Sequence, residues 1–256
     1  MLLEVRGLTK YFGGLASVND LDFHVKRGET LGIIGPNGAG KTTVFNLISG
    51  ALPPSRGRIL FKGENITGCN ASVTARKGIA RTFQLANLFN DKTVLENMSM
   101  AFYLESKFKL RSAVFNTSSL RERERNISRK SHELIEFVGL GGMADKPVKA
   151  LPHGHRKCLA FAMALAASPE LLLLDEPVAG MNTAETAHMI DLIRVVLNET
   201  GVTILLVEHN LRVIMDLCKR ILVLNFGTKI AEGSPDEIRE DQRVIEAYLG
   251  VAFHAA

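Results

Sequence analysis

The stretch Gly35 to Thr43 constrains the fold of this chain more than any other part of the sequence. It reads GPNGAGKTT and matches the phosphate-binding pattern GxxxxGK(S/T). The apolar run 31–34 before it is typical of a short buried strand, and residues 44–49 after it predict a helix that Gly50 ends. Strand, glycine loop and helix in this order predict a phosphate site, because the loop N–H groups and the helix N-terminus direct partial positive charge toward one point. A plain glycine-rich turn before a helix is the alternative.

Two side chains of this loop have expected roles in binding a nucleotide. Lys41 is expected to contact the β- and γ-phosphates, and the Thr42 hydroxyl is expected to ligate Mg²⁺. The remaining expected contacts to the nucleotide are Asn37, Gly38, Ala39, Gly40 and Thr43.

Composition narrows the class of protein to a moderately charged globular chain. Its 256 residues suffice for one large domain, or for a core with a smaller subdomain. The formal net charge of +4 is too small to favour a dedicated nucleic-acid binder. The cysteines have no CxxC spacing, which argues against a disulfide framework or a zinc site and favours core thiols at Cys69, Cys158 and Cys218.

The sequence predicts neither a membrane span nor a secretion signal. Its apolar runs all fall short of the roughly 18 residues that a spanning helix needs. The first residues lack the basic-then-apolar order of a signal peptide. We therefore expect a cytoplasmic protein whose role at a membrane depends on a partner.

Hydrophobic periodicity predicts an α/β core interrupted by an all-helical insertion. Alternating or turn-bounded runs in the first third of the chain predict a small antiparallel sheet, and continuous apolar runs later predict parallel strands covered by helices on both faces. The antiparallel runs are 2–9, 18–25 and 57–63, the parallel runs are 171–174, 202–207 and 221–224, and a further strand is predicted over 78–84. From Thr93 to Ala167 the period is helical and predicts no strand.

Three segments have distinctive helical patterns. Residues 183–199 predict a helix whose apolar stripe contains Ile190, Ile193 and Leu197. The order Ser-Pro-Asp-Glu at 234–237 is a capping box, and it predicts one C-terminal helix that continues to about Leu249. The mixed-charge run 121–130 favours a solvated helix face over a nucleic-acid patch.

The apolar run 171–174 ends in two adjacent carboxylates, Asp175 and Glu176. Ligands of open α/β sheets bind at the C-terminal edge of the strands. Because neighbouring residues at a strand end point in different directions, Asp175 is expected to hold Mg²⁺, directly or through water, while Glu176 acts as general base on the attacking water. An exposed acidic turn is the alternative.

The order and spacing of these motifs resemble those of the ATPase subunits of ABC transporters over nearly the whole chain. The resemblance rests on 35–43, Gln84, 151–155, 171–176, 179–182 and His209. It implies an α/β P-loop NTPase fold of the ABC ATPase type, with a small antiparallel β subdomain and an inserted all-helical subdomain. It also implies ATP hydrolysis as the activity, with ATP and Mg²⁺ as cofactors.

The resemblance also implies how one ABC ATPase domain, residues 1–256, is divided. Residues 1–87 and 165–232 are expected to form the α/β core with its antiparallel subdomain. Residues 88–164 are expected to form the helical subdomain with the signature motif, and residues 233–256 a C-terminal helical extension.

Four residues outside the phosphate loop and the acidic pair acquire roles through the resemblance. Phe12 resembles the aromatic residue that stacks on adenine, and Val18 is also an implied contact to the nucleotide. Gln84 resembles the hinge glutamine that senses Mg²⁺ and the γ-phosphate, and it is counted here as catalytic and as a metal ligand. His209 resembles the switch histidine that bonds the γ-phosphate and positions Glu176. Ordinary packing and structural roles are the alternatives for Phe12, Gln84 and His209.

Residues 151–155, LPHGH, resemble the signature sequence LSGGQ, which in the family contacts the ATP bound to a second subunit. Pro152 stands at the serine, His153 at the first glycine and His155 at the glutamine. Pro152 offers neither a hydroxyl nor an N–H, so the Gly154 backbone and the helix N-terminus must supply the phosphate contact, with His155 as a further donor.

Asn182 falls in the loop that crosses the dimer interface in the family. Together with Glu185, three residues later, it also predicts a helix cap. The two interpretations are compatible with each other.

Several short segments are most similar to the ATPases of branched-chain amino acid importers, namely 11–14, 81–84, 93–97, 207–210 and 230–250. The resemblance implies an ATPase that powers an importer for branched-chain or related amino acids. Urea and aromatic-acid importers are alternatives within the family. A P-loop kinase, an ATPase acting on nucleic acid or protein complexes, and a passive nucleotide-binding regulator are alternatives outside it.

The partners implied are a second ATPase subunit, identical or closely related, and two transmembrane permease subunits docked near residues 84–89. A solute-binding protein would act indirectly, and nucleic acid is not expected as a partner. The expected location is the inner face of the cell membrane, as a peripheral subunit.

Overall fold

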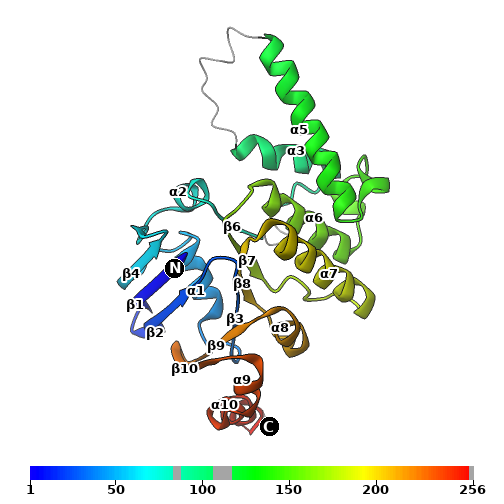
Figure 1. Ribbon diagram of the computed structural model, residues 1–256. Helices are drawn as coiled ribbons and strands as arrows, with labels where there is room; N and C mark the ends of the chain where they lie inside the picture. The colour runs from blue at the N-terminus through cyan, green and yellow to red at the C-terminus, as the bar shows by residue number, and fades with distance from the viewer. Residues whose placement is uncertain (83–87, 106–116, 254–256) are drawn as a thin grey trace. The chain divides into compact units, whose positions relative to one another are not determined.

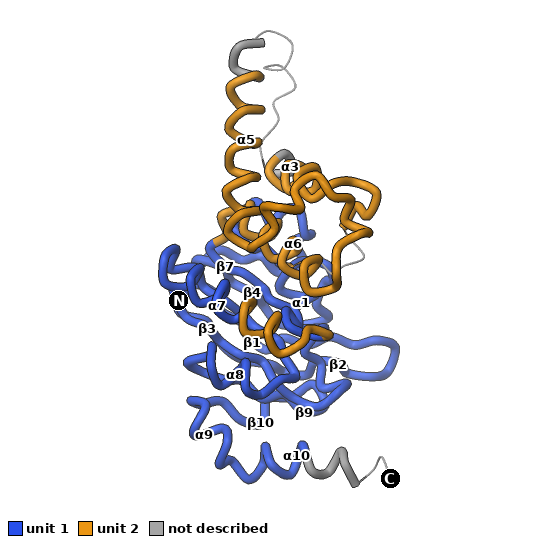
Figure 2. The backbone as a smooth tube through the Cα atoms, turned by 90° about the vertical axis from the view of Figure 1, so that its right-hand side faces the viewer, with its two compact units in different colours: residues 1–81, 170–179, 190–256 blue, residues 82–169, 180–189 orange. Residues whose placement is uncertain are grey.

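The computed structural model describes residues 1–82, 88–105 and 117–253. Contacts divide the chain into two units, each described here by itself (Figure 2). Unit 1 comprises residues 1–81, 170–179 and 190–256, and unit 2 comprises residues 82–169 and 180–189. The division expected from the sequence, with a helical subdomain over 88–164, stays a prediction.

Unit 1 contains two sheets, and the first is antiparallel with the strand order β2-β1-β4-β5 (Figure 1). Its strands are β1 (Leu3–Phe12), β2 (Leu15–Val25), β4 (Arg56–Phe61) and β5 (Glu64–Asn65). The central strand β1 pairs Leu3 with Val25 on one side and with Phe61 on the other. Because side chains alternate along a strand, Leu3 and Val5 share the buried face, and a register shift after Val5 brings Leu8 inward as well.

The second sheet of unit 1 has the order β10-β9-β3-β8-β7-β6 and is parallel except for β10. Its strands are β3 (Thr30–Ile34), β6 (Ile79–Arg81), β7 (Leu171–Asp175), β8 (Thr203–Val207), β9 (Arg220–Asn225) and β10 (Thr228–Gly233). Every residue of β3 and β8 is buried, as expected for parallel strands covered on both faces. The carboxyl ends of β3, β7 and β8 therefore meet at one edge of this sheet, where the phosphate loop and the acidic pair begin.

Helix α1 (Lys41–Ile48) lies between the two sheets of unit 1 (Figure 1). Phe45, Leu47 and Ile48 pack in one hydrophobic cluster with side chains of both sheets. The other helices that lie wholly in unit 1 are α2 (Ala71–Arg76), α8 (Leu211–Leu217), α9 (Pro235–Glu240) and α10 (Gln242–Phe253). This packing anchors the phosphate loop at both of its ends.

Unit 2 is helical in the part of the chain that the structure describes. It contains α3 (Val94–Glu105), α5 (Thr117–Phe137), α6 (His153–Ala166), the 3-10 turns Gly141–Met143 and Val148–Ala150, and the first part of α7 (Thr183–Thr200), which continues into unit 1. The predicted change to a helical period is confirmed there. The mixed-charge run 121–130 lies on α5 and is largely exposed, with Ile127 as its buried member, which confirms the prediction of a solvated face.

Two helix predictions are wrong in detail. The buried residues of α7 are Met189, Leu192, Ile193 and Val196, whereas Ile190 and Leu197 are only half-buried, because the spacing i, i+3, i+4, i+7 starts one residue earlier than expected. The C-terminal segment forms α9 and α10 rather than one helix. Asp241 leaves the helical conformation with ψ 115°, and its side chain accepts the Arg243 N–H at 2.9 Å, which begins a new helix.

The predicted architecture, an α/β core with a separate antiparallel sheet and a helical insertion, is confirmed. Sequence patterns missed the short strand β5, the edge strand β10, and the helices α2 and α8. The capping box at Ser234 is present, with the Ser234 hydroxyl accepting the Glu237 N–H. Cys158 and Cys218 are buried thiols as expected, whereas Cys69 is only partly buried.

Candidate nucleotide-binding and hydrolysis site

The phosphate loop requires glycine at two positions where the backbone passes close to neighbouring strands. At Gly35, φ is +150° and a Cβ atom would lie 2.1 Å from the Leu224 carbonyl oxygen. At Gly40, φ is +99° and a Cβ atom would lie 2.4 Å from the Ser17 carbonyl oxygen. No other residue fits such contacts, so the loop is held between β9 and β2 in a conformation that only glycine allows.

Lys41 begins α1, and its side chain is almost fully buried. Its Nζ atom donates hydrogen bonds to the carbonyl oxygens of Gly35 at 2.7 Å and Pro36 at 2.9 Å. Burial lowers the pKa of Lys41, while the charges of Glu176 and Asp175 act in the opposite direction. The ammonium group therefore lies inside the loop, within electrostatic reach of Glu176, the predicted base, and of Asp175, the predicted metal ligand.

The other residues expected to contact the nucleotide surround this lysine. Asn37, Gly38 and Thr42 are exposed, while Ala39 and Gly40 are buried. The Thr43 hydroxyl is 2.8 Å from the Ser17 hydroxyl of β2, and this hydrogen bond ties the first turn of α1 to the antiparallel sheet. The exposed backbone of the loop and the Thr42 hydroxyl remain accessible to a ligand at the helix N-terminus. The roles of Asn37, Gly38, Ala39, Gly40, Thr42 and Thr43 in binding a nucleotide stay predictions.

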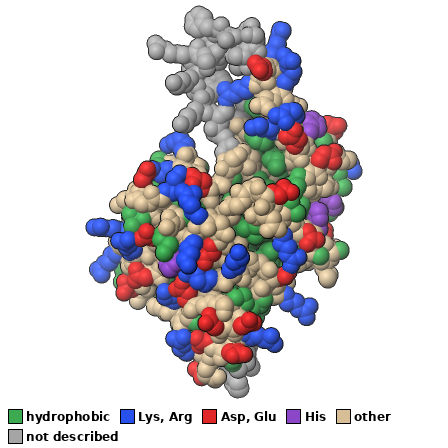
Figure 3. All heavy atoms as spheres, in the orientation of Figure 1, with side chains coloured by type: hydrophobic (Ala, Val, Ile, Leu, Met, Phe, Trp, Pro, Cys, Tyr) green, Lys and Arg blue, Asp and Glu red, His purple; other side chains and the backbone are tan. Residues whose placement is uncertain are grey.

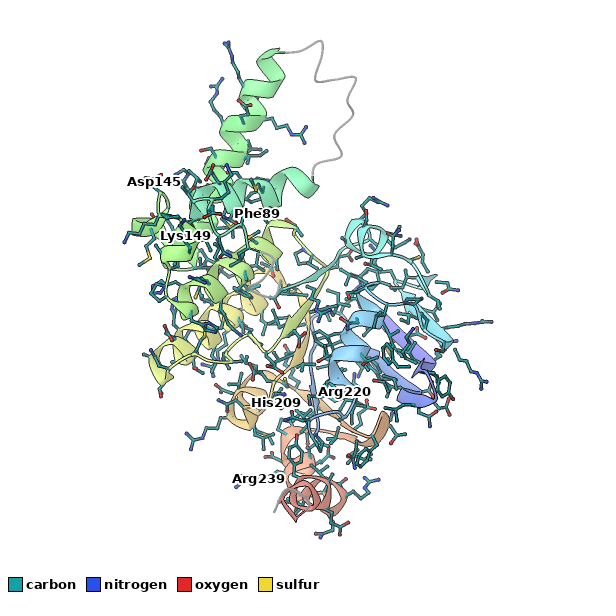
Figure 4. All side chains as sticks on the ribbon, turned by 180° about the vertical axis from the view of Figure 1, so that it is seen from behind. Phe89, Asp145, Lys149, His209, Arg220 and Arg239 are labelled. Atoms are coloured by element: carbon teal, nitrogen blue, oxygen red, sulfur yellow. The ribbon has the colours of Figure 1, made fainter. Side chains whose placement is uncertain are left out.

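Glu176 and His209, predicted to act together, are brought together in the structure. Glu176 follows β7 and His209 follows β8, and His209 Nε2 lies 3.0 Å from Glu176 Oε1. Glu176 has φ +48°, a conformation that is uncommon outside glycine, and its N–H donates to the Val207 carbonyl at 2.8 Å. Figure 4 shows His209 at the beginning of the segment that leads into α8.

Glu208 is a residue of this site that sequence reasoning missed. Its side chain is 3% exposed. Glu208 Oε1 accepts the Val178 N–H at 2.9 Å, and Oε2 accepts the His209 N–H at 3.1 Å and the Asn210 N–H at 3.4 Å. One buried carboxylate thus joins the loop after β7 to the loop after β8. The sequence offers one signal for this role, a glutamate at the end of an apolar strand, directly before His209. A buried carboxylate at such a position needs hydrogen-bond donors, and the loop N–H groups supply them.

Asp175 is the last residue of β7, and Arg81 at the end of β6 forms an ion pair with it. Arg81 Nη2 lies 2.6 Å from Asp175 Oδ2. In the sequence, Arg81 stands out only as part of the segment 81–84 that is similar to branched-chain amino acid importer ATPases. An arginine beside the predicted metal ligand could not be foreseen, because Arg81 and Asp175 are far apart in the sequence.

The donor set at this edge of the sheet fits a magnesium ion only if phosphate oxygens complete it. Thr42 offers a hydroxyl and Asp175 a carboxylate, which are hard oxygen ligands of the kind that Mg²⁺ prefers. Within residues 1–82, 88–105 and 117–253, no group of three His, Cys, Asp or Glu side chains could hold a metal ion.

Phe12 and Val18, the expected contacts to the base, differ in exposure. Phe12 is the last residue of β1 and is about half exposed, with Lys10 Nζ 5.4 Å from its ring centroid. Val18 on β2 is fully buried and contacts the position that a Cβ atom of Gly40 would take, at 3.5 Å. The exposed ring of Phe12, next to Lys10, is available for stacking. Val18 is buried and packs against the phosphate loop at Gly40.

The signature-like segment of unit 2 begins α6. Pro152 is the N-cap with φ −55° and ψ 158°, and the helix starts at His153. A Cβ atom at Gly154 would lie 2.4 Å from Glu185 Oε1, so this glycine permits the close approach of α7. His155 Nδ1 is buried and has no hydrogen-bond partner among the described residues.

Asn182 and Glu185 form the predicted cap at the start of α7. The Asn182 N–H donates to Glu185 Oε2, and the Glu185 N–H donates to Asn182 Oδ1, both at 3.0 Å. The helix-cap interpretation is thereby confirmed, and the interface interpretation stays a prediction. Gln84 lies outside the described residues. Within the predicted docking segment, Leu88 is buried and Phe89 is exposed, with its N–H donating to Asn97 Oδ1 at 3.0 Å (Figure 4).

Charged side chains of both signs are mixed on the face of the molecule that Figure 3 shows. On the face that Figure 3 shows, Lys and Arg side chains alternate with Asp and Glu side chains. Among the described residues, no helix is both long enough and apolar enough to cross a membrane.

Comparison with known proteins gives a consistent result. A family model described as ABC transporter matches residues 18–179, and one described as Branched-chain amino acid ATP-binding cassette transporter matches residues 228–254. The chain is 39% identical over 251 residues to the High-affinity branched-chain amino acid transport ATP-binding protein BraF of Pseudomonas aeruginosa, covering 98% of both chains. It has the same identity and coverage with LivG of Escherichia coli K12, a protein of the same description. The solved ADP conformation of an ATP-binding cassette of an ABC transporter superposes with a TM-score of 0.84 at 28% identity, covering 97% of this chain and 98% of that one.

Proposed function

Because this chain belongs to the ABC transporter family of ATP-binding proteins, we propose that it is the ATP-hydrolysing subunit of an importer for branched-chain amino acids. The observation that carries the catalytic part is the contact of Glu176 with His209 beside a glycine loop that holds Lys41. The substrate class rests on the descriptions of the 39% identical relatives and on the C-terminal family match.

ATP would bind at the N-terminus of α1 together with Mg²⁺. Lys41 would exchange its contacts to the Gly35 and Pro36 carbonyls for the β- and γ-phosphates, and backbone N–H groups of the loop would donate to the same oxygens. Thr42 and Asp175 would hold the metal, which supplies charge neutralisation at the transferring phosphoryl group. The exposed ring of Phe12 would stack on the base.

Hydrolysis needs a base that takes a proton from water and a group that keeps this base in place. Glu176 accepts the proton as the water oxygen bonds to the γ-phosphorus and the bond to the β-phosphate oxygen breaks, giving ADP and phosphate. His209 Nε2 holds the Glu176 carboxylate and contacts the γ-phosphate. Glu208 fixes the backbone of His209, so the geometry is set before ATP binds.

We place a second copy, or a close relative, against this site. The N-terminus of α6 in one subunit, with Gly154 and His155, would contact the γ-phosphate bound by the other subunit. Because Pro152 has no hydroxyl and His153 replaces a small residue, this half of the site would depend on backbone donors and on His155. The pair of subunits would dock on two permease subunits at the cytoplasmic side of a membrane, through a surface that includes Phe89.

The test is the variant Glu176→Gln, which keeps the shape of the site and removes the base. We expect it to bind Mg-ATP as the wild type does and to lose at least about 100-fold in phosphate release, the lower end of the effect of general base catalysis. It should also accumulate an ATP-bound dimer in size-exclusion chromatography. Wild-type turnover in Glu176→Gln would overturn the assignment of the base.

The substrate class has its own test. The chain is co-expressed with the permease subunits that co-purify with it and reconstituted in proteoliposomes with the cognate solute-binding protein. Leucine, isoleucine and valine should stimulate ATP hydrolysis, and urea and benzoate should not. Stimulation by urea or benzoate alone would replace the proposed substrate class while leaving the ATPase assignment intact.

A further inference from the structure

Arg81 makes three contacts that converge on the Asp175 side of the site. Its Nη2 atom lies 2.6 Å from Asp175 Oδ2, and its Nη1 atom donates to Asn46 Oδ1 on α1 at 2.6 Å. Its guanidinium carbon lies 5.8 Å from the centroid of the Phe45 ring, also on α1. Arg81 therefore connects the ends of β6 and β7 to the helix that follows the phosphate loop.

This ion pair is shielded from water. The side chains of Arg81 and Asp175 are 19% and 10% exposed, so their attraction is stronger than that of a surface pair. The planar guanidinium donates to Asp175 with one nitrogen and to Asn46 with another, so Asn46 on α1 holds the guanidinium in place while it pairs with the carboxylate. Removal of Arg81 would leave a poorly hydrated carboxylate without this cation.

The charge of Asp175 matters for nucleotide binding because ATP without a metal is strongly anionic. A carboxylate at the phosphate site repels this anion, whereas Mg²⁺ between the two groups removes the repulsion. A protein cation paired with Asp175 reduces the same repulsion without a metal. The contribution of Arg81 should thus be largest when Mg²⁺ is absent.

We propose that Arg81 is a positioning residue that holds Asp175 and acts as its internal counter-charge, and that it thereby sets how strongly nucleotide binding depends on Mg²⁺. The proposal rests on the proposed function, because it takes Asp175 as the acidic residue next to the bound nucleotide. Neither the phosphate loop nor the acidic pair requires an arginine at position 81. The proposed role of Arg81 therefore rests on its ion pair with Asp175.

The experiment measures the dissociation constant of a fluorescent ATP analogue with excess Mg²⁺ and with EDTA. The quantity compared between variants is the ratio of the EDTA value to the Mg²⁺ value. The variants are Arg81→Gln and Arg81→Met, which remove the charge, Arg81→Lys, which keeps it, and Asp175→Asn alone and combined with Arg81→Gln. Urea unfolding without nucleotide is recorded for each.

When Asp175 is kept, Arg81→Gln and Arg81→Met should raise the ratio of the dissociation constant in EDTA to that in Mg²⁺ about tenfold. This size is typical of coupling between contacting residues. Arg81→Lys should stay within about twofold of the wild type. In the Asp175→Asn background, Arg81→Gln should change the ratio by less than about threefold, because no carboxylate charge remains to be compensated. In urea, Asp175→Asn should restore part of the stability that Arg81→Gln loses.

Arg220→Met is the matched control. The Arg220 side chain is 18% exposed, close to the value for Arg81, and it also bridges carboxylates, but those belong to Glu29 and Glu232 (Figure 4). This variant should lose stability and keep the wild-type ratio.

An unchanged ratio in Arg81→Gln and Arg81→Met would overturn the proposal. So would an equal rise on Arg81→Gln with Asp175 and with Asp175→Asn, because Arg81 would then act on the nucleotide directly. If neither charge-free variant folds, a failure of Asp175→Asn to rescue Arg81→Gln would overturn it as well. If the wild type binds no nucleotide under either condition, the proposed function fails. If the wild type binds nucleotide and the Arg81 variants show the same Mg²⁺ dependence, only the inference about Arg81 is contradicted.

Discussion

At the scale of single residues, Glu176 and Glu208 differ in exposure and in contacts around the candidate phosphate site. Glu176 is half-exposed and contacts His209, as a group that must reach water and substrate. Glu208 is buried and accepts hydrogen bonds from the backbone N–H groups of Val178, His209 and Asn210. The two glutamates therefore differ in their expected roles: Glu176 is accessible for the proposed chemistry, and Glu208 links the loops that follow β7 and β8.

The role of Glu208 is tested by Glu208→Gln. An amide cannot accept hydrogen bonds with both of its heavy atoms, so at least one backbone N–H loses its acceptor. We expect the free energy of unfolding to fall by about 1–3 kcal/mol, the cost of an unsatisfied buried group. The kcat value should fall while the KM for ATP stays near that of the wild type, since the loop of His209 loses its support.

Steady-state ATPase kinetics and urea denaturation measure these effects. Glu199→Gln, at an exposed position of α7, is the control and should change neither quantity. A Glu208→Gln variant with wild-type stability and wild-type kcat would show that these backbone contacts do not organise the site.

The cysteines give a second prediction at this scale. Burial raises the pKa of Cys158 to about 11, with the charge of Glu185 as a smaller cause, and burial raises the pKa of Cys218 to about 12. Because the thiolate is the reactive form, both thiols should be inert in the folded protein, and only Cys69 should react quickly with a thiol reagent at pH 8. Titration with a chromogenic disulfide before and after unfolding measures this. Rapid reaction of all the thiols in the folded protein would contradict it.

Secondary-structure elements show how far local sequence determines this fold. The buried strands β3, β7, β8 and β9 were predicted because their apolar runs are continuous and bounded by turns. The break between α9 and α10 was not, because it depends on one side chain, Asp241, that competes with the helix for a backbone N–H. The stripe of α7 was misplaced by one position, because several apolar residues compete for its buried face.

The candidate site divides in the same way. Lys41, Asp175 and Glu176 belong to contiguous motifs whose chemistry is readable in a short window of sequence. The contacts of Arg81 and Glu208 join residues that are distant in the chain, and only the packing of neighbouring strands brings them together. Gln84 lies outside the described residues, so its predicted role stays a prediction.

The junction between the two sheets gives a prediction at the scale of elements. Arg220 at the start of β9 binds Glu29 at 2.7 Å and 3.0 Å, donates to the His24 carbonyl at 2.6 Å, and pairs with Glu232 of β10. Burial is the largest single influence on the pKa of Glu29 and raises it, but the hydrogen bonds from Arg220 and from the Lys26 N–H, together with the charges of these two residues, outweigh burial and hold this pKa below the ordinary value of 4.5. Glu29 therefore stabilises the folded state above pH 4.5 and loses this contribution as the pH falls through the lowered pKa.

Arg220→Met should consequently lower the free energy of unfolding by about 3 kcal/mol at pH 7, the cost of removing one partner of a buried ion pair. The difference between this variant and the wild type should shrink below pH 4.5, where protonation of Glu29 removes the charge that Arg220 compensates. Urea unfolding across a pH series measures both effects. A difference that stays constant down to pH 3 would contradict the role of Glu29.

The whole molecule carries a candidate nucleotide site in unit 1 and a signature-like segment in unit 2. In the proposed function, these two parts act together only between two subunits. Unit 1 carries the phosphate loop, the acidic pair and His209, and unit 2 carries the signature-like start of α6. In the proposed function, the site of one copy is completed by α6 of another, so ATP binding would be coupled to association of subunits. The energy that reaches the permease is then the difference in ATP affinity between the open and the closed pair.

The signature-like segment gives a prediction at this scale. Because Pro152 lacks a hydroxyl, Pro152→Ser should add a phosphate contact and raise the turnover of the assembled dimer, with unchanged ATP affinity of the separate subunit. His155→Ala should lower turnover about tenfold through loss of one donor, a change of about 1.4 kcal/mol in barrier height. Turnover is measured at several protein concentrations, because the effect should appear only where dimers form. Equal effects at concentrations where the subunit is monomeric would contradict action across the interface.

The central claim is that this polypeptide binds Mg-ATP through the loop that contains Lys41. Isothermal titration calorimetry of the purified chain with Mg-ATP tests it most directly, with Lys41→Ala as the variant. The account predicts a dissociation constant between about 1 μM and 1 mM for the wild type, in the range of cellular substrate affinities, and binding at least about tenfold weaker for Lys41→Ala. No heat of binding for the wild type, or equal affinities for the two proteins, would contradict it.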